Sequence, residues 1–201
     1  MTARAVDAVV VGAGVIGLST GICLAESGLK VRIWTSELPQ RTTSAAAVAM
    51  IGPALSPSSD TASSWDQVTV EEFSRLAEVP DTGVHLCRGR LAARQAPQEP
   101  FRGFETCTPD ELPEGFSFGF WATLALVDMP RYLAYLAGRF ESLGGTIDLH
   151  PVGSLAEAAR EAPLVANCAG VGARDLVPDP LVRAVWGQQV IVENPGLDTF
   201  S

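Results

Sequence analysis

The sequence lacks clustered positive charge and any long apolar run. Its 14 lysines and arginines stand against 23 aspartates and glutamates, for a net charge of −9. No basic cluster suited to nucleic acid or to an anionic membrane surface is present. No apolar run reaches the ~18 residues that span a bilayer, and Asp7 and several glycines interrupt the apolar N-terminal stretch, unlike a signal peptide. We therefore expect no nucleic-acid partner, no membrane partner and a cytoplasmic location.

Cysteine and histidine are also scarce. The four cysteines are widely separated and only two histidines accompany them, so no paired spacing predicts a metal site. Cys23 and Cys168 fall in apolar segments, and we expect both to be small buried side chains. The chain has 201 residues, of which 47% are hydrophobic. It is therefore long enough to bury the core of one large or two small domains.

The N-terminal segment contains the pattern of a dinucleotide-binding turn. A β-branched run at 9–11 leads into Gly12-Ala13-Gly14-Val15-Ile16-Gly17. In such a pattern the first glycine permits a tight turn, the second lets the backbone approach phosphates, and the third lets the helix pack closely on the strand. Glycines also serve ordinary turns. The strand before them and the helix after them favour a pyrophosphate site at the positive end of that helix.

The segments that follow complete a strand–helix–strand unit. Apolar residues recur at helical spacing over 15–25, Gly28 is a C-terminal stop, and a second buried strand covers 30–34. This order predicts parallel strands. A ribose-binding acid often follows the second strand, and here the positions read Thr35-Ser36-Glu37. Either Glu37 contacts the ribose, or Ser36 and backbone groups do so and Glu37 is a solvated surface charge.

A cluster of hydroxyl groups precedes a stretch of unusually small side chains. Thr42, Thr43 and Ser44 lead into an alanine-rich segment at 45–49 and then Met50. The hydroxyls are suited to phosphate or ribityl oxygens, and the N–H groups beside small residues are suited to the polar edge of a flavin ring. The alternative is an alanine-rich helix that starts here, capped by Thr43 or Ser44.

The rest of the chain alternates between predicted helices and strands, which indicates the α/β class. Ser154 and Glu157 have the spacing of a capping box. The predicted elements are an amphipathic helix at 65–76, β-rich segments at 84–93 and 116–127, a helix between Asp128 and Gly144, a strand at 146–149 and a buried strand at 164–166.

Several segments together resemble the D-amino acid oxidase family. They are the glycine-rich turn, the Arg-Thr-Thr-Ser-Ala-Ala-Ala segment at 41–47, and 167–173 followed by 179–181 and 187–188, in the order and spacing of that family. The resemblance implies FAD-dependent removal of a hydride from the α-carbon of a D-amino acid. Reoxidation by O2 would then give hydrogen peroxide, and the products would be a 2-oxo acid and ammonia.

The resemblance also implies a domain organisation and a set of cofactor contacts. A Rossmann-like FAD-binding domain would comprise 1–79 and 126–187, and part of a mixed-sheet substrate domain would comprise 80–125 and 188–201. By this resemblance, Ala169 would stand where family members often carry a hydroxyl that bonds the cofactor. Gly52 and Ala54 would replace larger residues that line the substrate pocket in some members. The implied contacts are pyrophosphate with 12–17, adenosine ribose with Thr35 and Ser36, phosphates and ribityl chain with Thr42, Thr43 and Ser44, the flavin ring with Ala49 and Met50, and adenine with Val152.

No catalytic residue is assigned. In the family the arginine and tyrosines that hold the substrate carboxylate lie beyond residue 201, so the chain is expected to match the first two-thirds of an oxidase. Neutral D-amino acids such as D-alanine are the expected substrates. Two other functions stay open: a non-catalytic nucleotide-binding fragment, and a nicotinamide-dependent dehydrogenase, against which the 42–44 and 167–170 segments argue. The sequence indicates no oligomeric state.

Overall fold

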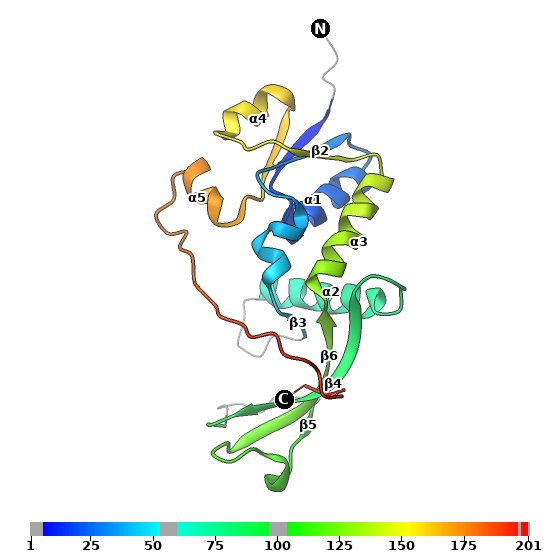
Figure 1. Ribbon diagram of the computed structural model, residues 1–201, viewed down its shortest axis with the longest axis vertical. Helices are drawn as coiled ribbons and strands as arrows, with labels where there is room; N and C mark the ends of the chain where they lie inside the picture. The colour runs from blue at the N-terminus through cyan, green and yellow to red at the C-terminus, as the bar shows by residue number, and fades with distance from the viewer. Residues whose placement is uncertain (1–5, 53–59, 97–103, 197, 201) are drawn as a thin grey trace. The chain divides into compact units, whose positions relative to one another are not determined.

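The chain forms two compact units, each built from two separate stretches of sequence. The computed structural model describes residues 6–52, 60–96, 104–196 and 198–200 (Figure 1), so Ala54 lies outside the described residues. The first unit comprises residues 1–48 and 129–189, and the second comprises 49–128 and 190–201. The domain organisation expected from the sequence would assign 49–79 to the cofactor-binding domain, and it stays a prediction.

The first unit is organised around a four-stranded parallel sheet in the order β7-β2-β1-β8. Its central strand β1 is buried along its whole length, as expected of a β-branched run with layers on both faces. The strands are β1 (Ala8–Val11), β2 (Val31–Thr35), β7 (Thr146–Leu149) and β8 (Leu164–Asn167). All neighbouring pairs are parallel, so their carboxyl ends lie at one edge of the sheet.

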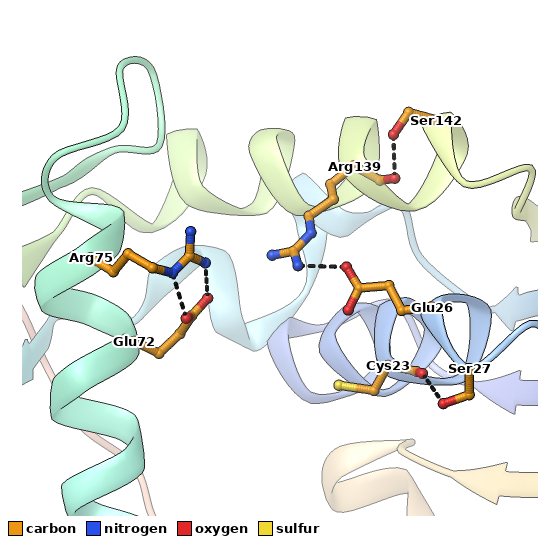
Figure 2. A network of polar contacts seen from close by, with 7 residues as sticks. All are labelled: Cys23, Glu26, Ser27, Glu72, Arg75, Arg139 and Ser142. Atoms are coloured by element: carbon orange, nitrogen blue, oxygen red, sulfur yellow. Dashed lines mark hydrogen bonds and ion pairs between the residues drawn. The ribbon is translucent and has the colours of Figure 1, made fainter.

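Helices α1 (Val15–Glu26) and α3 (Met129–Ser142) pack together on one face of this sheet. A Cβ atom at Gly21 of α1 would lie 3.1 Å from Ile33 Cδ1 and 3.1 Å from Phe140 Cε2, so only glycine permits this spacing without movement of its neighbours. Nη2 of Arg139 in α3 lies 2.6 Å from Oε1 of Glu26 in α1 (Figure 2). Two helices that are far apart in sequence thus form one layer.

Helix α4 (Leu155–Glu161) covers the opposite face. Side chains alternate along a strand, so Val9, Val11 and Trp34 point away from the face that Ile33 shares with α1. These three residues form a core cluster with Ala158 and Ala162, at and just after α4. The first unit therefore has three layers, helix, parallel sheet and helix, as the Rossmann-like prediction requires.

The second unit contains an antiparallel sheet in the order β3-β6-β4, with the short β5 also paired to β6. Phe120, Ala122 and Leu124 form the core of its apolar face, and Phe200 packs against them. The N–H of Arg90 donates to the carbonyl of Phe200 over 2.9 Å. The elements are β3 (Ala49–Ile51), α2 (Asp60–Leu76), β4 (Val84–Ala93), β5 (Glu105–Thr106), the 3-10 turn η3 (Pro109–Glu111) and β6 (Phe118–Val127).

Most predicted elements are confirmed within a few residues. The strand at 84–93 has the predicted bounds, the strand at 146–149 likewise, and the helix after Asp128 ends before Gly144. Gly28 and Gly144 follow their helices with φ angles of +88° and +84°. Such left-handed angles explain why glycine occupies both positions.

Three local predictions are wrong. Cys23 is exposed rather than buried, because its position on α1 faces solvent, and Cys168 is only half-buried. The strand at 164–166 is not buried, since β8 lies at the edge of the sheet and Leu164 is 41% exposed. Ser154 makes no side-chain cap, and the Glu157 carboxylate instead accepts the N–H of Gly153 over 3.2 Å.

Candidate cofactor site

A cavity of about 720 Å³ opens at the carboxyl edge of the parallel sheet, entirely within the first unit. This edge is where ligands bind in open parallel α/β sheets. The walls come from the segments at the end of each strand: 12–14 and 16 after β1, 35–37 and 41–44 at and after the end of β2, 150–153 after β7, and 168–173 with 175 and 176 after β8. The last segment contains η4 (Gly170–Gly172) and the short helix α5 (Ala173–Leu176).

The glycine turn makes the floor of this cavity. Gly12 has a φ of +105°, a region that side chains other than glycine rarely adopt. A Cβ atom at Gly12 would also overlap the backbone carbonyl of Cys168, and one at Gly17 would overlap the carbonyl of Gly12. Gly12 and Gly17 therefore hold β1, α1 and the end of β8 closer together than any side chain permits. The start of α1 is thereby fixed at the cavity.

Ser44 lies directly over the start of α1. The backbone N–H of Val15 donates to Ser44 Oγ over 3.1 Å, and a Cβ atom at Gly14 would lie 3.0 Å from the same oxygen. Gly14 is the N-cap of α1 and has no side chain to accept that bond. Ser44, in the 3-10 turn η2 (Thr43–Ala46), supplies it instead. The Ser44 proton remains available to an acceptor in the cavity.

Thr42 and Arg41 lie beside Ser44 in the lining. Thr42 Oγ1 donates to the carbonyl of Pro39 over 2.7 Å, at the start of the turn η1 (Pro39–Arg41). Arg41 and Thr43 also line the cavity, and both are exposed. Hydroxyls, a guanidinium group and a helix N-terminus together form a donor set that matches a diphosphate. The alternative prediction was an alanine-rich helix that starts here. The structure has only the short 3-10 turn η2 at this place.

The threonine at the end of β2 bonds within its own turn. Thr35 is buried, and its hydroxyl donates to the carbonyl of Glu37 over 2.7 Å. The backbone carbonyl of Thr35 accepts the N–H of His150 over 2.8 Å, which ties this turn to the segment after β7. Ser36 and Glu37 line the cavity and are exposed. Thr35 therefore shapes the wall, while Ser36 and Glu37 offer the groups that face the cavity.

His150 and Glu157 form a polar pair at the end of β7. His150 Nε2 lies 2.8 Å from Glu157 Oε1, and the His150 ring lies against Trp34 with 4.3 Å between centroids. Hydrogen bonds from His150 and then from the Gly153 N–H hold the pKa of Glu157 below its ordinary value. His150 and Gly153 both line the cavity.

The structure brings most of the predicted cofactor residues together. Val15 contributes its N–H to Ser44, and Gly17 lies behind the glycine turn. Ala49 and Met50 lie on β3 in the second unit and do not line this cavity. The predicted residues in the lining are Gly12, Ala13, Gly14, Ile16, Thr35, Ser36, Thr42, Thr43, Ser44 and Val152.

Several residues that line the cavity were not predicted from the sequence. Trp34, His150 and Asn167 each lie at or just after the end of a strand of the parallel sheet, and Asp175 follows in α5. The rule that parallel strands end at one edge would have indicated the first three. Among the described residues, no group of three or more His, Cys, Asp or Glu is placed to hold a metal ion. None of the described helices is long and apolar enough to cross a membrane.

Residues 7–200 match the DAO family, described as FAD dependent oxidoreductase. The chain belongs to this FAD-dependent oxidoreductase family. The match covers both compact units of the structure. The family expected from the sequence is thereby confirmed.

Two bacterial relatives in this oxidoreductase family are named D-amino-acid oxidase. The one from Rubrobacter xylanophilus is 45% identical over 199 residues, and the one from Streptomyces coelicolor is 41% identical over 206 residues. Each alignment covers 96% of this chain and 61% of the relative. The human protein named D-aspartate oxidase is 32% identical and is also covered over 61% of its length. The chain thus spans about three-fifths of the relatives it matches.

Solved structures support the same fold for this chain. Glycine oxidase from Geobacillus kaustophilus superposes with a TM-score of 0.67 at 20% identity, over 87% of this chain and 58% of that one. NikD in its open form superposes with a TM-score of 0.57 at 18% identity, over 88% of this chain and 54% of that one. At these identities the likeness concerns the fold alone.

Proposed function

We propose that this protein takes part in the FAD-dependent oxidative deamination of D-amino acids, and that the cavity of the first unit holds the adenosine and diphosphate part of FAD. One observation carries the proposal: the Gly12 turn, the start of α1 and the hydroxyls of 42–44 all meet at a single cavity. The names of the 45% and 41% identical relatives supply the chemistry.

The residues of the cavity have separable roles under this proposal. The glycine turn lets phosphate oxygens approach the backbone, and Ser44, Thr43 and Arg41 donate to those oxygens. Ser36 and Glu37 face the ribose, and Val152 lies beside the adenine. When bound, FAD would accept the hydride from the α-carbon of the substrate and pass the electrons to O2. Ala49 and Met50 stay proposed neighbours of the flavin ring.

The substrate is proposed from the relatives rather than from a described pocket. The names of the two bacterial relatives point to D-amino acids in general, and the name of the human relative points to D-aspartate as an acidic alternative. The preference for neutral D-amino acids such as D-alanine stays a proposal from the sequence resemblance. No arginine of this chain is assigned to the substrate carboxylate, so no catalytic residue is proposed. The cytoplasmic location and the absence of a nucleic-acid partner stay predictions from the sequence.

A cofactor titration of the purified chain tests the first half of the proposal. FAD is added at equilibrium while its fluorescence is followed, and ADP is then added as a competitor. We expect FAD to bind and ADP to displace it, because both present the same adenosine diphosphate group. Binding of NADH in place of FAD would favour the nicotinamide-dependent alternative and contradict this proposal.

Anaerobic substrate addition tests the second half. D-alanine, and L-alanine as the matched control, are mixed with the FAD-loaded chain while the visible flavin spectrum is recorded. Bleaching by D-alanine alone, followed by peroxide formation when oxygen returns, is the result expected of an oxidase. Bound flavin that neither enantiomer bleaches would support the other alternative, a cofactor-binding fragment without turnover.

A further inference from the structure

The segment 150–153 is held in place by one carboxylate. Glu157 Oε1 lies 2.8 Å from His150 Nε2, and Glu157 Oε2 accepts the N–H of Gly153 over 3.2 Å. Both ends of the segment are therefore fixed from a single side chain of α4. The side chains of His150 and Glu157 are 43% and 31% exposed, so the pair lies at the protein surface rather than in the core.

Two further contacts fix the same segment from the sheet side. The backbone N–H of His150 donates to the carbonyl of Thr35 over 2.8 Å. The His150 ring lies 4.3 Å from the Trp34 ring, tilted by 35°. His150 thus joins the end of β2 to the start of α4, and Pro151 and Val152 lie between these two attachment points. All of these residues except Glu157 line the cavity.

We propose that Glu157 and His150 are positioning residues, which hold the 150–153 wall of the cavity in the form that the adenosine part of the cofactor meets when it binds. The inference rests on the proposed function, since it concerns the same cavity. Glu157 would not touch the cofactor itself, because it acts through His150 and Gly153. A pre-formed wall lowers the ordering cost of binding, so loss of the pair weakens binding of the adenosine part.

Helix α4 offers a matched control. Glu161 lies on the same helix and makes an ion pair of 3.1 Å with Arg32, but it does not line the cavity. Glu161→Gln therefore removes one carboxylate from α4 without touching the 150–153 segment. A general loosening of α4 would affect the Glu157 and Glu161 variants alike, whereas the positioning role affects the Glu157 variant alone.

ADP titration of four chains tests the proposal. We expect Glu157→Ala to weaken ADP binding about tenfold, the loss of a charge-assisted hydrogen bond. Glu157→Gln keeps an acceptor for Gly153 and a donor for His150, so it should stay within about threefold of wild type. Glu161→Gln should match wild type. Equal affinity of Glu157→Ala and wild type would overturn the inference, as would equal weakening by Glu161→Gln.

Hydrogen exchange in the ligand-free chain separates this inference from the proposed function. Glu157→Ala should accelerate exchange of the Gly153 N–H about tenfold relative to wild type, while Glu161→Gln should leave it unchanged. Unchanged exchange at Gly153 would overturn the positioning role even where ADP binds well. Failure of the wild-type chain to bind either FAD or ADP would instead refute the proposed function, and the cofactor role of the pair with it.

Discussion

The Ser44 hydroxyl caps the first turn of α1 from 29 positions away, by accepting the N–H of Val15 over 3.1 Å. An N-cap normally comes from the residue that precedes the helix, but that position is Gly14, which has no side chain. Glycine at this position and serine at 44 are therefore complementary. Glycine leaves room for a ligand at the helix start, and serine satisfies a backbone donor when none is bound.

Replacement of Ser44 tests this long-range cap. Ser44→Ala should lower the free energy of unfolding of the ligand-free chain by about 1 kcal/mol, the usual loss when an N-cap hydroxyl is removed. Thermal unfolding followed by circular dichroism measures the effect. Ser36→Ala is the control, because Ser36 is an exposed hydroxyl of the same cavity. A loss as large for Ser36→Ala would contradict the special role of Ser44.

Alanine at Gly12 should be far more damaging than alanine at Gly28. Both glycines have left-handed φ angles, +105° and +88°, so each substitution costs about 1–2 kcal/mol in backbone strain. Only at Gly12 would the new Cβ also overlap the carbonyl of Cys168, whereas nothing lies within 4 Å of it at Gly28. In urea unfolding, Gly12→Ala should have a clearly lower midpoint than Gly28→Ala. Equal midpoints would contradict the additional cost of steric overlap at Gly12.

The packing between α1 and α3 should depend on Phe140 much more than on the neighbouring ion pair. Phe140 is fully buried, so Phe140→Ala should cost about 3–5 kcal/mol. Glu26→Gln removes the negative charge from the 2.6 Å contact with Arg139, which is drawn in Figure 2. Because the two side chains are 44% and 29% exposed, that change should cost less than about 1 kcal/mol. Denaturant unfolding of both variants measures the difference, and a reversed order would show that the charge pair dominates.

Stability in acid should depend on Glu111. Its carboxylate accepts bonds from the Thr108 N–H, the Thr108 hydroxyl and Trp121 Nε1, and these bonds hold its pKa below the ordinary 4.5. A lowered folded-state pKa stabilises the protein above pH 4.5, and this contribution is lost as the pH falls through the lower value. Glu111→Gln should therefore be less stable than wild type at neutral pH, with the difference shrinking in acid. A difference independent of pH would exclude the carboxylate charge as its cause.

The cysteines should react with a thiol reagent in a defined order. Cys23 is exposed, whereas Cys107 is 8% exposed. Burial, and next the nearby Glu111, raise the pKa of Cys107, so less of its reactive thiolate is present at neutral pH. The native chain should show a fast phase from Cys23 and a slow phase from Cys107. Cys23→Ser should remove the fast phase, and its persistence would mean that another thiol is responsible.

Local pattern was enough to predict the parts of this protein that depend on neighbours in sequence. The glycine turn, the strand at 84–93 and the helix ending before Gly144 all follow from backbone preference and periodicity. Each of these signals is complete within one short segment. The hydroxyl-bearing segment at 42–44, also recognised from sequence alone, lies in the wall of the cavity, and its contact with the cofactor stays a prediction.

Local sequence pattern does not predict contacts between segments that are distant in the chain. Spacing suggested that Glu157 caps its own helix, but the carboxylate binds His150 and Gly153, because these groups reach it once β7 is in place. The exposure of Cys23 and of β8 depends on which elements lie beside them, and periodicity does not contain that information. The donor to Ser44 likewise comes from a segment that only the folded chain brings near.

The pairing of Ala49 with Val127 bears on whether the parallel-sheet unit can be produced without the second unit. These residues are partners in the antiparallel register of β3 and β6, so the 49–128 stretch of the second unit begins and ends at neighbouring points. Antiparallel partners lie roughly 5 Å apart, a gap that two or three residues of linker bridge easily. The parallel-sheet unit is thus interrupted in sequence but not in space, and a short splice from residue 48 to residue 129 would make it one continuous polypeptide.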